Sequence, residues 1–380
     1  MSTVIHDPVF RRPMEPRFLK WQPTELMEWA KTGYTTEGHF NLARSGVPSI
    51  TSVSDWPGGP YVPDLYGHNE WGHEGLKAVI AEMYGTGAEN VLIAQGASQC
   101  NFLMAGSVLA DGGTAIVETP LYQPILRSIQ VWADRVVRLP RRREKGYQPD
   151  PADLRKLIDE HTRLVMLTNL HNPTHASLDM DAVATMVSIA AEVGAVVVID
   201  EVFLAMLRRD HRTHGYSRGA ISLNSLGKSW GLDALRVGWG IGPADIVHRA
   251  YRLNNLLGVN QPHMTEDLAY RVLKSPAAVE TMLAGVAKAT AGRDLFEDFV
   301  AATPEVSCVM PPAGISALVE LPAGTDDLEF SRELQAQKKT VVFPGSFFEC
   351  PGTVRVSFGG PVEEVREGLS RLRSMIKERV

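Results

Sequence analysis

Short apolar runs alternate with amphipathic stretches through the middle of the chain. Seven runs are rich in β-branched and other apolar residues, at 91–94, 114–118, 135–139, 163–167, 195–200, 221–226 and 236–242. Between them, 102–110, 121–133 and 180–194 have helical patterns. Strands that are apolar almost throughout, alternating with helices, indicate a parallel sheet covered on both faces. We therefore predict an α/β fold with a mixed, mostly parallel seven-stranded sheet covered by helices.

The pattern changes in the last third of the chain. A long helical region (263–302) precedes β-rich runs and a terminal amphipathic helix, which indicates a smaller α+β domain. The first 50 residues are rich in proline and aromatics, with weak periodicity. We expect an N-terminal segment (1–50) that joins the small domain, a large ligand-binding domain (51–260) and a small C-terminal domain (261–380).

Composition and charge narrow the classes of function. The net charge of −6 gives no global basic field for nucleic acid or an anionic membrane. No apolar run has the length of a membrane span or of a signal-peptide core. Three widely spaced cysteines, Cys100, Cys308 and Cys350, argue against a disulfide framework or a zinc site. We expect a cytoplasmic protein with neither a nucleic-acid partner nor a metal.

Polar residues follow several of the predicted strands, where ligands bind in open α/β sheets. Gly96 and Ala97 form a tight turn into a helix that Ser98 opens, an arrangement suited to an anion such as phosphate. Tyr122 opens the next helix, where an aromatic ring can stack on a flat ligand. Taken alone, Gly-Ala-Ser before a helix is often only a cap, and an isolated tyrosine more often serves packing.

Two further strand ends carry an amide and a carboxylate. Asn172 lies in the turn TNLHNPTH, where it can aim its amide at a ligand, although turn chemistry also explains Asn-Pro. Asp200 ends an apolar strand, where an unpaired carboxylate would be costly. No basic residue lies near it in the sequence, so a cationic ligand group would satisfy it. Taken alone, a strand-end aspartate that the protein itself satisfies explains this residue equally.

The stretch SLGKSWGLDALRVGWG (225–240) places a lysine and an arginine among small and apolar residues. Partial desolvation of Lys228 would lower its pKa and make its amine a nucleophile toward aldehydes. Arg236 starts the next strand and can donate a forked pair of hydrogen bonds to a phosphate, while Ser225 adds a hydroxyl.

The order of these residues resembles class I/II aminotransferases, which are fold-type I enzymes dependent on pyridoxal 5'-phosphate (PLP). The resemblance covers roughly residues 60 to 360. It implies that Lys228 holds PLP as a Schiff base, in the Ser225-x-x-Lys228 element completed by Arg236. The other roles that it implies are phosphate binding (Gly96, Ala97, Ser98), ring stacking (Tyr122), bonding to the cofactor's phenolic oxygen (Asn172) and pairing with the ring nitrogen (Asp200).

The same resemblance implies how the substrate and a partner subunit bind. Arg355 in TVRVSFG resembles the arginine that clamps the substrate α-carboxylate, and Gly46 is a second expected substrate-binding residue. A homodimer with sites at the interface is implied. Tyr66 in LYGHNEWGHEGLK would reach the partner's phosphate, although the spacing there is one residue longer than usual.

The chain departs from the family pattern in three places. Phe203 stands where the family has a tyrosine whose hydroxyl supports the cofactor's phenolate. The usual NPTG turn ends in His175, and His171 precedes it. His68 and His73 lie in the loop before the first helix. These four histidines are either surface groups or extra acid–base groups at the site.

The departures leave the reaction open. A PLP-dependent aminotransferase acting on an α-amino acid is the predicted function. The alternative is an enzyme of β- or γ-elimination, replacement or cyclisation, because residues 33–49 resemble capreomycidine-synthase-like enzymes of natural-product pathways. A remote alternative is a non-catalytic PLP-fold domain that senses an effector for a transcription regulator.

Overall fold

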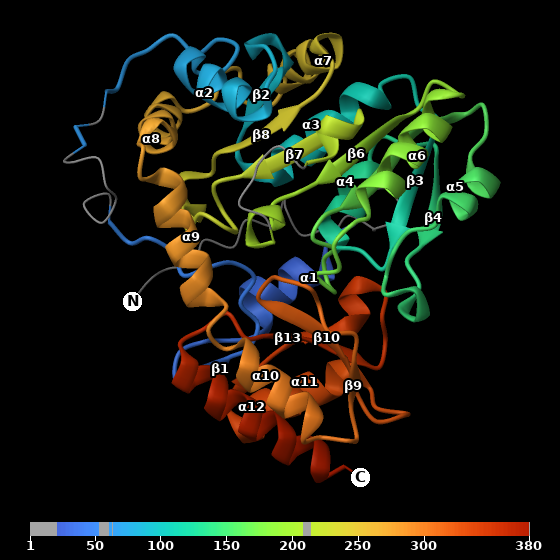
Figure 1. Cartoon of the computed structure of the whole chain (residues 1–380), viewed down its shortest axis with the longest axis vertical. Coiled ribbons are helices and arrows are strands. Elements are labelled where there is room, and N and C mark those ends of the chain that lie inside the picture. Colours follow the sequence, from blue (N-terminus) through green and yellow to red (C-terminus); the bar gives the residue numbers. More distant parts are fainter. Residues whose placement is uncertain (1–20, 53–60, 63, 208–213, 380) are drawn as a thin grey trace, which may run out of the picture.

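A seven-stranded sheet forms the centre of the larger part of the molecule (Figure 1). The computed structural model describes residues 21–52, 61–62, 64–207 and 214–379. In spatial order the strands are β2 (Val91–Ala94), β8 (Gly238–Ile241), β7 (Ile221–Ser225), β6 (Val196–Asp200), β5 (Thr162–Thr168), β3 (Thr114–Thr119) and β4 (Arg135–Pro140). β8 is antiparallel to both of its neighbours, and the other pairs are parallel. The predicted α/β class and seven-stranded sheet are confirmed.

Helices cover both faces of this sheet, which explains why its strands are apolar almost throughout. On one face, α3 (Gly96–Val108), α4 (Gln123–Gln130) and α7 (Ala244–Asn254) share an apolar cluster with the strands. On the other, α5 (Pro151–Leu157) and α6 (Met180–Ala191) pack over β3 to β6.

The sheet edge at β2 is covered by three more helices. α2 (Glu74–Tyr84), α8 (His263–Lys274) and α9 (Ala278–Ala289) contribute to one apolar cluster with β2 and β8. Short 3₁₀ turns at Ala88–Asn90, Arg143–Lys145, Leu204–Met206, Gly215–Arg218, Asp233–Leu235 and Gly345–Phe348 complete the connections.

A second, antiparallel sheet lies in the lower part of Figure 1, in the order β12 (Phe343–Pro344), β13 (Thr353–Ser357), β10 (Ser316–Glu320) and β9 (Ser307–Cys308). Helices α10 (Arg293–Ala301), α11 (Asp327–Lys338) and α12 (Val362–Lys377) share its apolar core.

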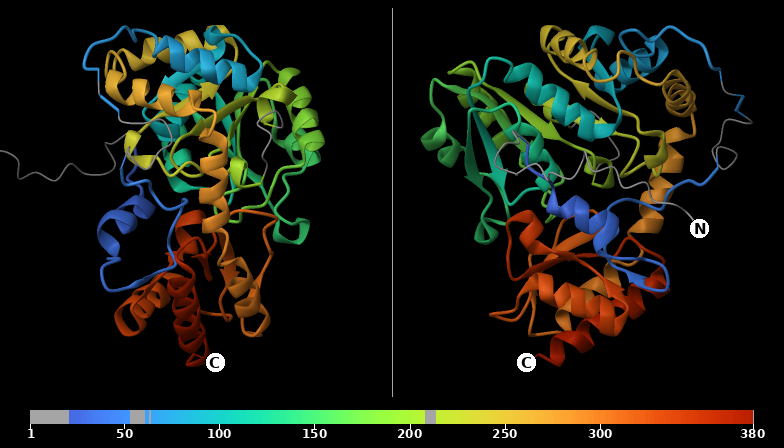
Figure 2. Two further views of the ribbon diagram at one scale, coloured as in Figure 1. Left: turned by 60° about the vertical axis from the view of Figure 1, so that its left-hand side comes forward. Right: turned by 180° about the vertical axis from the view of Figure 1, so that it is seen from behind.

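The N-terminal segment packs on this smaller unit (Figure 2). It forms α1 (Glu25–Glu28), a π-helical turn (Trp29–Gly33) and β1 (Phe40–Asn41), which pairs in parallel with β11 (Thr340–Val341).

The domain division stays a prediction, and the packing bears on where it falls. α8 and α9 follow residue 260, yet their apolar residues join the cluster of α2 and β8. The cluster of the smaller sheet instead takes residues from α10 onward. This packing supports a boundary after α9. The predicted boundary at residue 260 differs because the apolar pattern of a helix does not tell against which sheet it packs.

We predict that Leu42→Ala destabilises the protein by about 2–5 kcal/mol, since it leaves a cavity in the core of the smaller unit. Leu42 is fully buried beside the α12 side chains. Denaturant unfolding measures the change, with Val279→Ala, at an exposed position of α9, as the control. A loss below about 0.5 kcal/mol, the range of ordinary surface substitutions, would contradict this role of the N-terminal segment.

Candidate active site

A cavity of about 550 Å³ opens at the carboxyl ends of the parallel strands, between the main sheet, the smaller sheet and α1. This volume is typical of small-molecule sites. Nine of the residues predicted from the sequence line it: Ala97, Ser98, Tyr122, Asn172, Asp200, Ser225, Lys228, Arg236 and Arg355. Gly96 and Gly46 lie directly behind lining residues, whereas Tyr66 is exposed and is not part of the lining.

Lys228 follows β7 and directs its amine into the cavity. Its Nζ donates a hydrogen bond of 2.7 Å to Ser45 Oγ. Burial lowers the pKa of Lys228 to about 8, and the charges of Arg355 and Arg236 add to the effect. A substantial fraction of the amine is therefore neutral near physiological pH, as a nucleophile or a proton acceptor requires.

Gly46 packs against the backbone of Lys228. A Cβ atom at Gly46 would lie 3.2 Å from the Lys228 carbonyl oxygen, and the next amide, Val47 N, donates to that oxygen at 2.9 Å. Gly46 thus sits beside the lysine. Its predicted contact with the substrate stays a prediction.

Asp200, at the end of β6, is buried with a partner that the sequence did not reveal. Its Oδ2 accepts a hydrogen bond of 2.7 Å from Asn101 Nδ2, and its Oδ1 accepts one from Val202 N at 3.2 Å. Within the described ranges no lysine, arginine or histidine forms an ion pair with Asp200. Burial raises its pKa despite these hydrogen bonds. The carboxylate therefore lines the cavity without a cationic partner.

The start of α3 forms an anion-binding corner with Arg236. Gly96 has a φ of +76°, which favours glycine, and a Cβ atom there would lie 2.5 Å from Arg236 Nη2, so a side chain would displace the guanidinium. The first N–H groups of this 13-residue helix and the guanidinium favour an anion. Ser98 and Ser225 line the cavity beside them.

Arg355 reaches the cavity from β13. Its Nη1 donates a 2.9 Å hydrogen bond to Asn172 Oδ1, and its guanidinium lies over the rings of Phe343 and Phe348, 4.7 and 5.0 Å from their centroids. Its Nε is buried and has no hydrogen-bond partner among the residues that the structure describes. Burial lowers its pKa to about 10, which leaves it cationic at neutral pH. Such a guanidinium suits a carboxylate ligand.

Tyr122 and Phe203 both line the cavity. Tyr122 stands at the N-cap of α4 and donates its hydroxyl to Met27 Sδ at 3.4 Å, which links it to α1. Phe203 packs its ring on that of His175, with centroids 4.7 Å apart. The ring of Phe203 brings no hydroxyl to the site.

None of the four histidines lines the cavity. His68 is exposed beside Glu70, and His73 caps α2 by accepting from Leu76 N. His171 and His175 are fully enclosed by protein. Of the two alternatives, the surface position holds for His68. His171 and His175 fit neither alternative, because both are buried outside the lining of the cavity.

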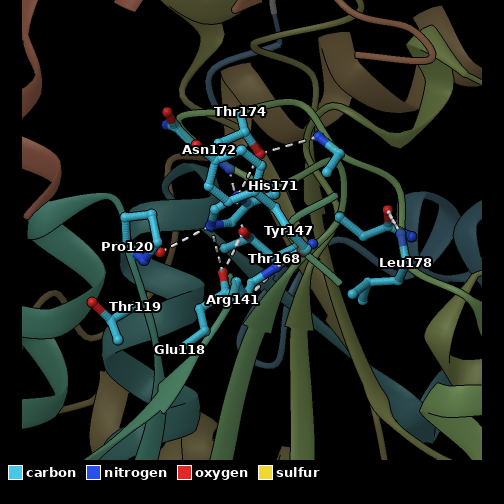
Figure 3. Close-up of polar contacts among 12 residues, drawn as sticks. Glu118, Thr119, Pro120, Arg141, Tyr147, Thr168, His171, Asn172, Thr174 and Leu178 are labelled. Carbon is cyan, nitrogen blue, oxygen red and sulfur yellow. Dashed lines mark hydrogen bonds and ion pairs between the residues drawn. The ribbon is translucent and has the colours of Figure 1, made fainter. Parts of the chain in front are cut away.

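A buried polar network lies behind Asn172, at the ends of β3, β4 and β5 (Figure 3). Glu118 accepts hydrogen bonds from Arg141 Nη1 at 2.8 Å and from Thr168 Oγ1 at 2.5 Å. His171 Nε2 donates to the Pro120 carbonyl at 2.8 Å, so its Nδ1 accepts from Thr174 Oγ1 at 2.6 Å. The network joins the loop before Tyr122 to the turn of Asn172, and sequence reasoning missed it.

The comparisons with known proteins identify the family. A model of the aminotransferase class I and II family matches residues 65–372, which is more than half of the chain. The chain belongs to this family. Members of the family use PLP, and the protein is accordingly a PLP-dependent transferase.

Individual relatives of this family differ in their reactions. The chain is 27% identical to capreomycidine synthase of Streptomyces vinaceus over 307 residues, which covers 79% of this chain and 78% of the relative. It is 26% identical to arginine–pyruvate transaminase of Pseudomonas aeruginosa over 316 residues, covering 79% and 80%. The chain thus spans most of the length of two relatives whose names give different activities.

Solved structures agree on the fold. A PLP-dependent aminotransferase from Streptococcus suis superposes with a TM-score of 0.80 at 22% identity, covering 95% of this chain and 99% of that one. Aspartate aminotransferase from Thermus thermophilus with maleate gives 0.81 at 18%, covering 96% and 100%. These likenesses confirm the predicted fold type I.

The cavity fits PLP in three respects. The cofactor carries a phosphate, a protonatable ring nitrogen and an aldehyde. The corner of Gly96 and Arg236 suits the phosphate, Asp200 lacks the cation that the ring nitrogen would supply, and Lys228 offers an amine of lowered pKa. The individual roles of these residues stay predictions.

We predict that the protein loses stability as the pH falls below about 6.5, in part because of its enclosed histidines. Burial lowers the pKa of His175 to about 3 and that of His171 well below its ordinary value. The unfolded chain takes up these protons near pH 6.5, whereas the folded protein does not, so acid favours unfolding.

Denaturant unfolding between pH 4 and 6 measures this effect. His175→Asn should reduce the dependence of the free energy of unfolding on pH by about 1.4 kcal/mol per pH unit. The matched control is His161→Asn, at an exposed position. Equal slopes for His175→Asn and the parent would contradict the neutral state of His175.

Proposed function

We propose that the protein is an aminotransferase that acts on an α-amino acid, with Lys228 as its catalytic residue. One observation carries the proposal: an amine of lowered pKa, a carboxylate without a cationic partner and a half-satisfied guanidinium line the same cavity. These are the groups needed to hold PLP and to bind an amino acid beside it.

The roles follow from the chemistry of each side chain. PLP, when bound, supplies an electron sink for the bond to be broken at the substrate Cα. Lys228 moves the proton at Cα, since its amine accepts and donates protons near neutral pH. Asp200 favours the protonated ring nitrogen. Tyr122 orients the ring, and Arg355 holds the substrate α-carboxylate.

The alternative of elimination, replacement or cyclisation has two supports. Phe203 brings no hydroxyl to the cavity, and capreomycidine synthase is among the relatives. Against it, none of the four histidines is among the described residues that line the cavity, so none adds an acid–base group there. Transamination therefore stays the first proposal.

The active unit in this proposal is a homodimer. Tyr66 is exposed and points to no group of the cavity in its own chain, and Leu65, Trp71, Leu256 and Val259 are also exposed. A second copy would cover such apolar side chains and bring its Tyr66 to the phosphate corner.

A cytoplasmic location stays a prediction. In the part of the chain that the structure describes, each helix is too short or too polar to span a bilayer.

We predict that an amino acid supplied alone converts the enzyme-bound cofactor to its amine form in a single turnover, with one equivalent of keto acid released. Absorbance spectroscopy with product analysis measures the conversion, since the two forms differ in their spectra. Release of ammonia or of a cyclised product, with the aldehyde form restored, would contradict transamination and favour the alternative.

A further inference from the structure

His175 closes the turn that carries Asn172, and its backbone is unusual for a residue with a side chain. Its φ is +53°, in the left-handed region that glycine adopts more readily. Its amide donates to the His171 carbonyl at 2.6 Å, which fixes the turn. Such a conformation persists where surrounding contacts hold it.

The imidazole crosses from the main sheet to the start of β10. Its Nδ1 accepts a hydrogen bond of 3.2 Å from Ile315 N, so Nε2 carries the hydrogen and faces Ser316 Oγ at 3.4 Å. Gly314 leaves space for it, because a Cβ atom there would lie 1.9 Å from Nδ1. Phe203 packs on the ring from the cavity side. Ile315 and Phe203 thus contact the imidazole, and Gly314 leaves room for it.

These contacts lead through one sheet to Arg355. β10 pairs with β13 in register, with Ser316 opposite Ser357 and Leu318 opposite Arg355. Arg355 in turn donates to Asn172 Oδ1, in the same turn as His175. The turn therefore holds the arginine at two points, directly through Asn172 and through β10 by way of His175.

These contacts between the turn and the smaller sheet matter because Arg355 and Lys228 come from different sheets. Lys228 follows β7 and Asp200 ends β6 in the main sheet, whereas Arg355 lies on β13. The distance between the guanidinium and the lysine thus depends on how the smaller sheet sits on the turn of Asn172. A misplaced binding group can cost an enzyme about a hundredfold in rate or affinity.

We propose that His175 is a positioning residue, which fixes Arg355 relative to Asn172 and Lys228 and so prepares the site for the substrate α-carboxylate. The inference rests on the proposed function, in which Arg355 binds that carboxylate. His175 makes no contact with the cavity itself, so the loading of PLP should not depend on it.

Burial, and then the charge of Arg355, lowers the pKa of His175 to about 3. Nδ1 therefore remains a hydrogen-bond acceptor throughout the range in which an aminotransferase is assayed.

Steady-state kinetics of two variants tests the proposal. His175→Gly suits the left-handed backbone but removes the imidazole. We expect it to raise KM for the amino acid about tenfold, the factor that one hydrogen bond commonly carries, with kcat within about twofold of the parent. His175→Asn also tolerates the backbone, and its Oδ1 takes the place of Nδ1. Its KM should stay within about threefold of the parent.

Either of two kinetic results would overturn the proposal: an unchanged KM in His175→Gly, or an equal rise in both variants. Absorbance of the bound cofactor should be the same in both variants and the parent. Arg355→Gln separates the inference from the function on which it rests. If Arg355→Gln leaves KM unchanged, the carboxylate role of Arg355 fails and the positioning role fails with it. If only His175→Gly leaves KM unchanged, the positioning role alone fails.

Hydrogen exchange of the Ile315 amide tests its hydrogen bond to His175. The first measurement uses the unaltered holoenzyme, so it does not depend on the folding of a variant. The amide should exchange slowly, and His175→Gly should accelerate it at least tenfold while the amide of Val319, bonded within the sheet, keeps its rate. Fast exchange of Ile315 in the parent would show that the link is absent and would overturn the proposal.

Discussion

Desolvation of charge at the carboxyl edge of the sheet is the constraint on which the rest of the structure depends. Among the described residues, Asp200 is buried with two N–H donors and no ion-pair partner, Arg355 is buried with an unsatisfied Nε, and Lys228 has a lowered pKa. Buried charges without partners are costly, so a fold retains them where a ligand completes them. In the proposed function, the ring nitrogen of PLP would supply the cation for Asp200, and an α-amino acid would supply the carboxylate for Arg355.

The fold places these charges by simple geometry. Parallel strands end at one edge, so the residues after β5, β6 and β7 meet there although they are far apart in the chain. The antiparallel β8 begins at the same edge, which brings Arg236 beside the start of α3. The smaller sheet then adds Arg355 from the opposite side. The site is therefore formed by residues at strand ends and by Arg355 from the smaller sheet, without a long loop.

Much of this arrangement could be read from the sequence, for identifiable reasons. The seven strands of the main sheet are visible because both faces are covered, which makes each strand an apolar run. Lys228, Asp200 and Arg236 stand out because they follow or begin such runs, where charges are unusual. Their order along the chain then identified the family.

Other features could not be predicted, because they depend on pairing in space. Asn101 meets Asp200 from 99 residues away, and Ser45 meets Lys228 from 183 residues away. The ion pair of Glu118 and Arg141 is likewise invisible in sequence, although a glutamate inside an apolar strand is a usable signal. Tyr66 remains untested because its proposed contact lies in a second copy.

Chemical trapping of the cofactor tests the central claim most directly. Borohydride reduction of the PLP-loaded protein, followed by proteolysis and peptide mass mapping, locates the amine that holds the cofactor. The account predicts one modified residue, Lys228, with no modification at any other lysine. Modification of a different lysine, or a protein that stays unmodified after loading, would contradict the assignment of this cavity as the active site.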